Sequence, residues 1–379
     1  MLHPNPFSSV DRRMIDIMAS KNRLPRISFG IIVLNGEPFT RYNLRALYPF
    51  AHEIIVVEGA NESAKAIASP SGHSIDGTLD VLRRIKAEED HENKIMIVTA
   101  EDEGYEDGFW SGEKLEQSQA YAKRATGDWL WQVDIDEFYK PKDMMWICNN
   151  LLNTPDVYAI SFKQIQFWGG LNWYTDGWYL HSGGEVFHRL FRWQFGFTYS
   201  SHRPPTVLNE TGIDLRNIGW ANAQSLAKRG VFLYHYSLVF PDQVHKKSEY
   251  YCSVDWGTFD HMKDWTRNSY DTLGKPYRVH NVYQHPSWLE WYRGSHPPEI
   301  LSMWEDVVNR RLDTAIDLRD TSDIEKLLRK WSYRFGRIVL KVIGPIVNTG
   351  KDFASALFKY LPESYKKHVR RALKGRERC

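Results

Sequence analysis

Three acidic residues stand almost side by side near the middle of the chain. Asp134, Asp136 and Glu137 directly follow the apolar run 129–133, which is typical of a buried strand. Two carboxylates separated by one residue at a strand end can share one divalent ion. Mg²⁺ and Mn²⁺ prefer carboxylate oxygens and often take substrate phosphates as further ligands. The spacing therefore predicts a metal site that would neutralise a departing diphosphate, with a solvated acidic turn as the alternative.

The acidic motif needs a sheet that brings other polar strand ends beside it. Further apolar runs predict strands at 27–34, 53–58 and 94–98, with helical patterns between them. Such alternation implies parallel strands joined by crossover helices. Ligands of open parallel sheets bind at the carboxyl ends of the strands. Those ends are polar here: Asn35–Glu37, Glu58–Gly59 and Asp134–Glu137. We therefore predict an α/β fold that is Rossmann-like, with a mostly parallel central sheet flanked by helices.

The second half of the chain has a different pattern. Short aromatic strands are expected at 158–162 and 230–234, and helices and loops beyond Pro241. The predicted organisation is a lead-in at 1–25, a catalytic domain at 26–250, a helical and loop extension at 251–325 and a basic amphipathic tail at 326–379. The catalytic domain divides into a nucleotide-binding half (26–140) and an acceptor half (141–250).

Cysteine content, hydropathy and charge limit the compartments and partners that we expect for this protein. Of the 379 residues only three are cysteines, without CxxC spacing, which argues against a disulfide framework or a zinc site. We see no signal peptide and no apolar run of membrane-spanning length, so a cytoplasmic protein is expected. Residues 326–379 have a net charge of +12 and the remainder −10. This tail predicts docking to an anionic membrane surface, on the inner face of the membrane; no nucleic-acid motif accompanies the charge.

At this point the motifs resemble those of the family 2 glycosyltransferases. The segment 31–37 looks like the first strand and Asn-x-Glu turn of that family. Glu58 is similar to the acid that ends the second strand, and 74–78 has the Ser-x-Asp-Gly-Thr pattern, displaced by an apparent insertion at 59–73. Gln119, with Ala and Gly six and eight residues later, stands where the family has Asn.

The second half resembles a narrower branch, the lipopolysaccharide-core glucosyltransferases. That branch has a series of short motifs in a fixed order. They are matched here by Asp134–Glu137, Gly177-Trp178, Arg189-Leu190-Phe191-Arg192, Ser201-His202, His235-Tyr236-Ser237, Lys247 and Tyr250 or Tyr251. Arg203 stands where the branch often has Glu.

The resemblance implies a GT-A fold with a helical C-terminal extension, and a metal-dependent, inverting hexosyltransferase. The donor would be a UDP- or GDP-sugar, the acceptor a glycan or lipid-linked saccharide in polysaccharide biosynthesis, and the cofactor Mn²⁺ or Mg²⁺. The implied metal ligands are Asp134, Asp136 and His235. The implied nucleotide-sugar-binding residues are Asn35, Glu37, Glu58, Asp76, Gln119, Asp134, Arg192 and Lys247.

The base that would deprotonate the acceptor has three candidates: Asp176, Glu185 and His202. Glu185 follows two glycines, a spot suited to a moving loop. Trp168, Trp173 and Trp178 lie in a Gly-interrupted segment and are expected to stack on acceptor sugar rings, or else to fill the core.

Two other functions fit parts of the pattern. A carbohydrate-binding or scaffold protein on a degenerate transferase fold would retain the strands without the chemistry. A phosphatase of the haloacid dehalogenase type also has D-x-D after a strand. It usually has the motif near the N-terminus and Thr or Val where this chain has Phe138, so we place it below the transferase.

Overall fold

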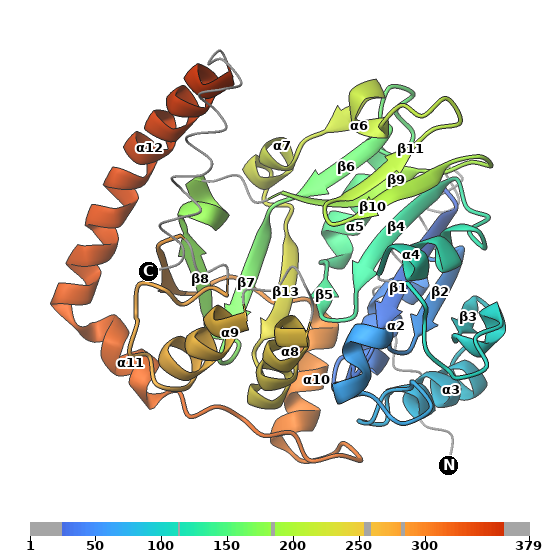
Figure 1. The fold of residues 1–379 in the computed structure, drawn as a ribbon, viewed down its shortest axis with the longest axis horizontal. Coiled ribbons are helices and arrows are strands. Elements are labelled where there is room, and N and C mark those ends of the chain that lie inside the picture. The colour runs from blue at the N-terminus through green and yellow to red at the C-terminus, as the bar shows by residue number, and fades with distance from the viewer. Residues whose placement is uncertain (1–24, 113, 183–185, 254–258, 282–284, 360–379) are drawn as a thin grey trace.

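The structure is a computed structural model that describes residues 25–112, 114–182, 186–253, 259–281 and 285–359. The lead-in predicted at 1–25 therefore lies almost wholly outside the described residues. Within the described part of the chain, strands form a large sheet, a smaller sheet and a separate hairpin, with helices on their faces (Figure 1).

The large sheet contains the strands predicted from the first half of the sequence. Its order is β12 (Trp220–Ala221), β6 (Ala159–Phe162), β9 (Phe187–Arg192), β4 (Trp129–Asp134), β1 (Ile27–Val33), β2 (Glu53–Glu58) and β3 (Ile95–Val98). All neighbours pair in parallel except β9, which is antiparallel to both β4 and β6. The predicted α/β class with a mostly parallel central sheet is confirmed.

The smaller sheet draws strands from distant parts of the sequence. Its order is β14 (Ser287–Trp291), β8 (Trp173–Gly177), β7 (Gln164–Trp168), β13 (Leu233–Leu238) and β5 (Glu137–Phe138). The hairpin pairs β10 (Thr198–His202) with β11 (Pro205–Leu208). Strand β14 lies in the segment where only helices and loops were expected, and it pairs antiparallel with β8. Its short, aromatic sequence shows no alternation that would separate it from a loop.

The helices flank the sheets and continue to the C-terminal end. In chain order they are α2 (Thr40–Leu47), α3 (Thr78–Glu88), α4 (Lys114–Ala122), α5 (Pro141–Asn150), α6 (Leu215–Ile218), α7 (Ala223–Lys228), α8 (Pro241–Ser253), α9 (Phe259–Trp265), α10 (Pro298–Val308), α11 (Ser322–Arg329) and α12 (Trp331–Lys359). Shorter turns include η2 (Glu62–Ile67) and a π-helical turn, η4 (Trp178–Ser182). Among the described residues, none of these helices combines the length and the apolar character that crossing a membrane requires.

Strand register brings the predicted polar strand ends together. Ile32 of β1 lies opposite Asp134 of β4, and Val33 of β1 lies opposite Glu58 of β2. Parallel strands end at the same edge of a sheet, so the acidic motif and the segments after β1 and β2 share that edge. The smaller sheet begins at the same place, because only a two-residue turn separates β4 from β5.

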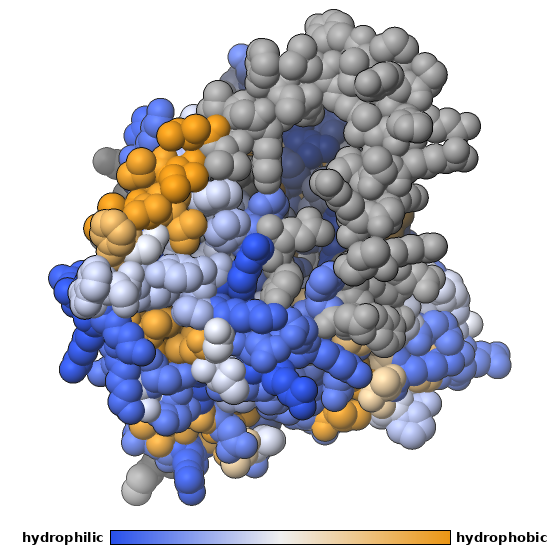
Figure 2. Space-filling model, turned by 60° about the vertical axis from the view of Figure 1, so that its left-hand side comes forward, coloured by the Kyte–Doolittle hydropathy of each residue, from blue (hydrophilic) through white to orange (hydrophobic). Residues whose placement is uncertain are grey.

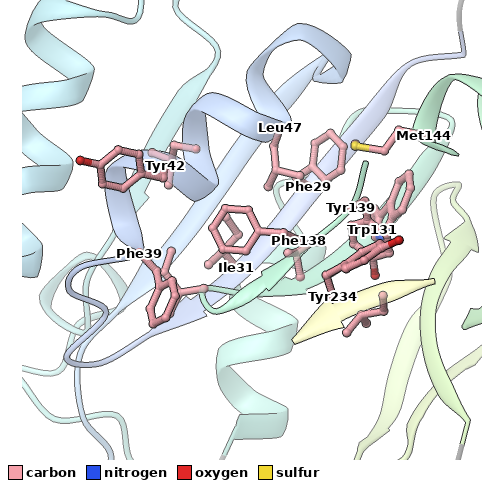
Figure 3. Close-up of a cluster of buried hydrophobic side chains, with 14 of the residues drawn as sticks. Phe29, Ile31, Phe39, Tyr42, Leu47, Trp131, Phe138, Tyr139, Met144 and Tyr234 are labelled. Atoms are coloured by element: carbon pink, nitrogen blue, oxygen red, sulfur yellow. The ribbon is translucent and has the colours of Figure 1, made fainter. Parts of the chain in front are cut away.

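Aromatic packing joins the large sheet to the elements beside it (Figure 3). The Trp131 ring stacks on Phe29 at 5.5 Å between centroids and on Phe162 at 5.8 Å, and Tyr139 meets it edge-on at 4.8 Å. These rings are fully buried, and buried aromatic side chains contribute large apolar areas to the core. The strand before the acidic motif is therefore held rigidly.

A glycine in β1 tests this packing. A Cβ atom on Gly30 would lie 2.4 Å from Cδ2 of the buried Tyr121 ring. We expect Gly30→Ala to lower the free energy of unfolding by about 1–3 kcal/mol, because overpacking displaces the ring. Denaturant unfolding measures the change. Gly274→Ala is the control, since its nearest neighbour would lie at 3.2 Å; equal effects of both variants would contradict the packing described here.

Candidate active site

A cavity of about 290 Å³ opens where the two sheets meet. One wall is formed by the ends of β1 and β4 and by the segment after β2, including Asn35, Gly59 and Asp134. Residues of α4, α8, β7, β9, β13, η4, the β10–β11 turn and the segment before β14 line the rest. They include Lys114, Gln117, Gln164, Gln166, Tyr179, Phe187, Arg203, His235, Ser237, Lys246, Lys247, Tyr250, Tyr251 and His280. The cavity thus lies at the edge that the sequence predicted for ligand binding.

Asp136 lies in the turn between β4 and β5 and lines the cavity. Its Oδ2 accepts hydrogen bonds from Lys247 Nζ at 2.6 Å and from Gln243 Nε2 at 3.0 Å, and its Oδ1 lies 3.3 Å from His235 Nε2. Burial opposes ionisation of Asp136, but the neighbouring Lys247 and His235 outweigh it and hold the pKa of the carboxyl well below its usual range. Asp136 is therefore a buried carboxyl group that is ionised at neutral pH.

His235 is oriented as a metal ligand would be. Its Nδ1 lies 2.9 Å from Gln164 Oε1, which can only accept, so the ring proton is on Nδ1. Nε2 then faces Asp136 Oδ1 at 3.3 Å, so a proton on Nε2 pairs with this carboxylate, and a divalent cation can take the place of that proton. A histidine that donates its second N–H to a carbonyl is the usual arrangement at metal centres. Asp136 and His235 thus fit a divalent ion by their chemistry.

The predicted set of three metal ligands is not assembled as a cage. In the described part of the chain, no three His, Cys, Asp or Glu side chains come together closely enough to hold a metal ion. Asp134 lines the same cavity, but its Oδ2 is paired with Arg189 Nη2 at 3.3 Å. An ion at Asp136 would therefore need further ligands from substrate or water, as is common for Mg²⁺.

Arg189 of β9 links the carboxylates on either side of the turn. Its guanidinium is almost completely buried and donates to Glu137 Oε2 at 2.8 Å as well as to Glu137 Oε1 and Asp134. Glu137 is fully buried and also accepts from the Asp134 backbone N–H at 3.2 Å. Burial opposes ionisation of Asp134, yet Arg189 and Lys114 lower its pKa to about 2. Arg189 therefore positions Asp134 and was missed as a site residue in the sequence.

Cationic and phenolic groups surround the acidic turn. Lys114, Arg203 and Lys247 line the cavity together with Tyr251. Burial and the charge of Arg203 lower the pKa of Lys114, so these cations lie close enough to repel one another. Burial opposes ionisation of Tyr251, but Arg203, Lys247 and Lys114 lower the pKa of its phenol. These side chains are therefore preorganised to bind an anion.

Of these cavity residues, only Lys247 was predicted from the sequence as a site residue. The spacing of four residues from Lys246 and Lys247 to Tyr250 and Tyr251 could have indicated a shared helix face.

Four predicted nucleotide-binding residues instead hold the segment after β2 in place. Glu58 is fully buried and accepts from Ser74 N, Ser74 Oγ and His73 Nδ1 at 2.7–2.8 Å. Asn35 lines the cavity, but its side chain bonds Ile67 O and Ile75 N. Asp76 accepts from Thr78 and from the Glu37 backbone N–H at 3.0 Å. Glu37 and Asp76 line a separate depression with Arg41 and Arg84 rather than this cavity.

Two other predicted nucleotide-binding residues lie outside the cavity. Gln119 donates to Thr198 Oγ1 and Tyr199 O, whereas Gln117, two residues earlier on the opposite face of α4, lines the cavity and donates to Gly59 O at 2.9 Å. Arg192 lies opposite Trp129, at the amino end of β4, and donates to Val157 O and Thr154 O. Residues three apart on a strand point to opposite faces, so Arg189 faces the carboxylates and Arg192 cannot.

The structure describes two of the three candidates for the base, Asp176 and His202, and neither of them lines the cavity. Glu185 lies outside the described residues, although Tyr179 and Phe187 on either side of it both line the cavity. Asp176 is buried in β8 and is not among the cavity residues; its Oδ1 accepts from Gly177 N. His202 is buried, bonds Ser118 Oγ through Nδ1 at 2.8 Å, and has its pKa lowered far below the usual value by burial and by Lys114.

The tryptophans predicted to bind acceptor are packing residues. Trp168 is fully buried and donates to Val279 O at 3.0 Å. Trp173 is also buried, and Trp178 packs beside α12 and donates to Leu340 O at 2.9 Å. None of the three lines the cavity; its aromatic surface comes from Tyr179, Phe187, Tyr250 and Tyr251.

Comparison with known proteins gives no match to a family model and none to a curated protein. Three solved structures illustrate the similarities found. A mannosyltransferase from Pyrobaculum calidifontis, in complex with GDP-Man and Mn²⁺, has 16% identity over 49% of this chain and 54% of its own, with a TM-score of 0.30. Glucosyl-3-phosphoglycerate synthase from Mycobacterium tuberculosis, in complex with Mn²⁺, UDP and glucosyl-3-phosphoglycerate, has 15% identity over 45% and 52%, with a TM-score of 0.27.

The third, S. aureus TarS 1–349, has 13% identity over 67% of this chain and 74% of its own, with a TM-score of 0.32. The chain spans about half the length of the first two structures.

The buried Arg189 makes a stability prediction. Arg189→Met leaves the fully buried Glu137 without its cation, so the free energy of unfolding should fall by about 3–5 kcal/mol. The double variant Arg189→Met/Glu137→Leu should recover part of that loss, because one uncompensated charge is removed with its partner. Denaturant unfolding of the wild type, both single variants and the double variant measures the coupling. Additive effects of the two substitutions would rule it out.

The placement of Glu37 makes a pH prediction. Burial, assisted by Asp76, raises the pKa of Glu37 to about 7. Stability from this group is therefore fully present below its unfolded pKa near 4.5 and is lost as the pH rises through 7. Glu37→Gln should raise the free energy of unfolding by about 1 kcal/mol near pH 8 and by less near pH 5.

Urea unfolding at the two pH values measures the Glu37 effect, and Glu62→Gln, a substitution at an exposed acid, is the control. A pH-independent difference would contradict the assignment. If Glu37→Gln lost nucleotide binding without gaining stability, Glu37 would be a nucleotide-binding residue, as the sequence predicted.

Proposed function

We propose that the chain is a GT-A glycosyltransferase that moves a sugar from a nucleotide diphosphate to a saccharide acceptor. The observation that supports this most is the composition of the cavity at the end of β4. Asp136 and His235, which fit a divalent ion, face a cavity wall that includes Lys114, Arg203 and Lys247. Adjacent metal-binding and anion-binding groups are what a metal diphosphate requires.

The residues of this chain would act mainly by holding charge. A divalent ion at Asp136 and His235, Mn²⁺ or Mg²⁺, would supply Lewis-acid stabilisation of the leaving diphosphate. Lys114 and Arg203, which line the same cavity, would bind phosphate oxygens. Lys247 pairs with Asp136. If a divalent ion paired with this carboxylate instead, the Lys247 ammonium would be available for a phosphate oxygen. Asp134, fixed by Arg189, would bind the donor ribose or a metal-bound water.

The acceptor would bind in the same cavity. Its lining also includes polar side chains and two rings: Gln164, Gln166, Ser237, His280, Tyr179 and Phe187. Aromatic faces with nearby amides suit a sugar ring, so we propose a glycan or lipid-linked saccharide acceptor that stacks on Tyr179 or Phe187. Glu185 lies in sequence between these two residues and is our proposed base for an inverting transfer.

We also propose a cytoplasmic enzyme of polysaccharide biosynthesis. Cys148 is buried and is not in a disulfide, as expected for a protein kept in a reducing compartment. The resemblance to the lipopolysaccharide-core branch supports an acceptor that is part of a cell-surface glycan.

The metal-binding pair tests the proposed function. Asp136→Asn should reduce transfer by at least about 100-fold, because the charge that holds the ion is lost. His235→Ala should weaken Mn²⁺-dependent binding of UDP or GDP about tenfold or more. Calorimetric titration with and without Mn²⁺, and nucleotide-sugar turnover with Mn²⁺ or Mg²⁺, measure these effects.

Asp80→Asn is the control for the metal-site variants, since it removes one exposed carboxylate on α3. Nucleotide binding that is independent of metal, or Asp136→Asn turning over like the wild type, would exclude the proposed mechanism. Metal-dependent nucleotide binding without turnover of any UDP- or GDP-sugar would favour a non-catalytic binding protein.

A further inference from the structure

Helix α12 has apolar side chains on two opposite faces. One face packs on the body of the protein through Tyr333, Leu340 and Gly344, and the Trp178 indole donates to Leu340 O across this contact. A Cβ atom on Gly344 would lie 2.7 Å from Trp178 Nε1, so glycine permits the close approach. This contact buries one apolar face of the helix, as expected for an amphipathic helix that packs on a globular domain.

The opposite face is apolar and exposed. Trp331, Phe335, Ile338, Val342 and Ile346 are 78%, 60%, 59%, 63% and 69% exposed, and we call them the outer stripe. Their spacing of four, three, four and four residues places them along one side of the helix. Figure 2 shows apolar surface gathered on this side of the molecule. Soluble surfaces rarely leave such a contiguous apolar stripe uncovered.

The charge around the outer stripe indicates what covers it. Lys326, Arg329, Lys330 and Arg334 are exposed at the start of the stripe, and residues 326–379 together have a net charge of +12. A second copy of the chain would bring an equal positive charge against the first, which repels. An anionic lipid surface has the complementary charge, and Trp331 is a side chain that favours the boundary between lipid and water.

We propose that α12 lies in the plane of an anionic lipid surface, with the outer stripe inserted among the acyl chains and the basic residues on the headgroups. This geometry is that of an interfacial amphipathic helix, whose binding combines buried apolar area with electrostatic attraction. The helix is also coupled to the cavity, because Trp178 of η4 packs against α12 while the adjacent Tyr179 lines the cavity. The membrane contact does not depend on the proposed transfer reaction.

Vesicle binding of stripe variants tests the proposal. The triple variant Phe335→Ser/Ile338→Ser/Val342→Ser should bind phosphatidylcholine vesicles containing phosphatidylglycerol at least about tenfold more weakly than the wild type, because three buried side chains are lost. Phe195→Ser is the matched control: Phe195 is 98% exposed in the turn between β9 and β10 and should leave binding unchanged. In about 1 M salt, where the Debye length is about 3 Å, residual binding should persist only where the stripe is intact.

A fluorescent label at position 342 distinguishes the possible occupants of the stripe. With Val342→Cys in a Cys379→Ser background, labelled with an environment-sensitive dye, emission should shift to the blue only with anionic vesicles. The same label at Phe195→Cys should not respond. A shift that depends on protein concentration without lipid would overturn the proposal in favour of a second copy.

Two other results would also overturn the lipid proposal. A label that is already shielded, with vesicles having no effect, would mean that another segment of the chain covers the stripe. Undiminished vesicle binding by the triple-Ser variant would mean that the basic residues bind lipid without the stripe. Circular dichroism of the triple variant confirms that the helix is retained, so that none of these outcomes reflects unfolding.

Discussion

The Arg189 guanidinium, clamped between Glu137 and Asp134, is the interaction on which the cavity depends. Strand β9 supplies the arginine, β4 ends at Asp134 and β5 begins at Glu137, so one buried cation ties the large sheet to the small one. A buried ion pair adds little net stability, but breaking it leaves an uncompensated charge, so it tolerates few alternative arrangements. The turn between the two strands is therefore held in one conformation, with Asp136 directed at the cavity. The rings of Phe29 and Phe162, which stack on Trp131, help to hold strand β4 in place.

Charge at the cavity is balanced across elements that are distant in the sequence. Asp136 is neutralised by Lys247 of α8, and Asp134 by Arg189 and Lys114. Within the cluster of Lys114, Arg203 and Lys247, burial and the charge of Arg203 lower the pKa of Lys114, so the protonated form of this lysine is costly. An anionic ligand would relieve part of that cost, so the arrangement favours an anion over a neutral ligand. The binding energy would thus come from groups that the fold has already placed and desolvated.

The high aromatic content has two separate uses. Three tryptophans stabilise the protein: Trp131 packs in the strand before the acidic turn, Trp168 lies in a buried apolar cluster, and Trp178 packs against α12. The rings available to a ligand are instead Tyr179, Phe187, Tyr250 and Tyr251. Because Trp178 and Tyr179 are neighbours in η4, the docking of α12 and the shape of the cavity are mechanically connected. If the outer stripe lies on lipid, the helix on the membrane contacts Trp178, and the next residue, Tyr179, lines the cavity.

Sequence by itself determined the order of strands and helices in the first half, the α/β class and the acidic edge of the sheet. These depend on local periodicity and on the rule that parallel strands end together, as Asp134, Asn35 and Glu58 show. It also indicated the amphipathic tail. The tertiary structure decided which of two nearby residues faces the site: Arg189 rather than Arg192 contacts the carboxylates, and Gln117 rather than Gln119 lines the cavity. It also buried Trp168 and Trp173, and it brought Lys114 and Arg203 to the acidic turn. The reason is physical: backbone periodicity acts over a few residues, whereas the face that lines a cavity is set by contacts between segments far apart in the chain.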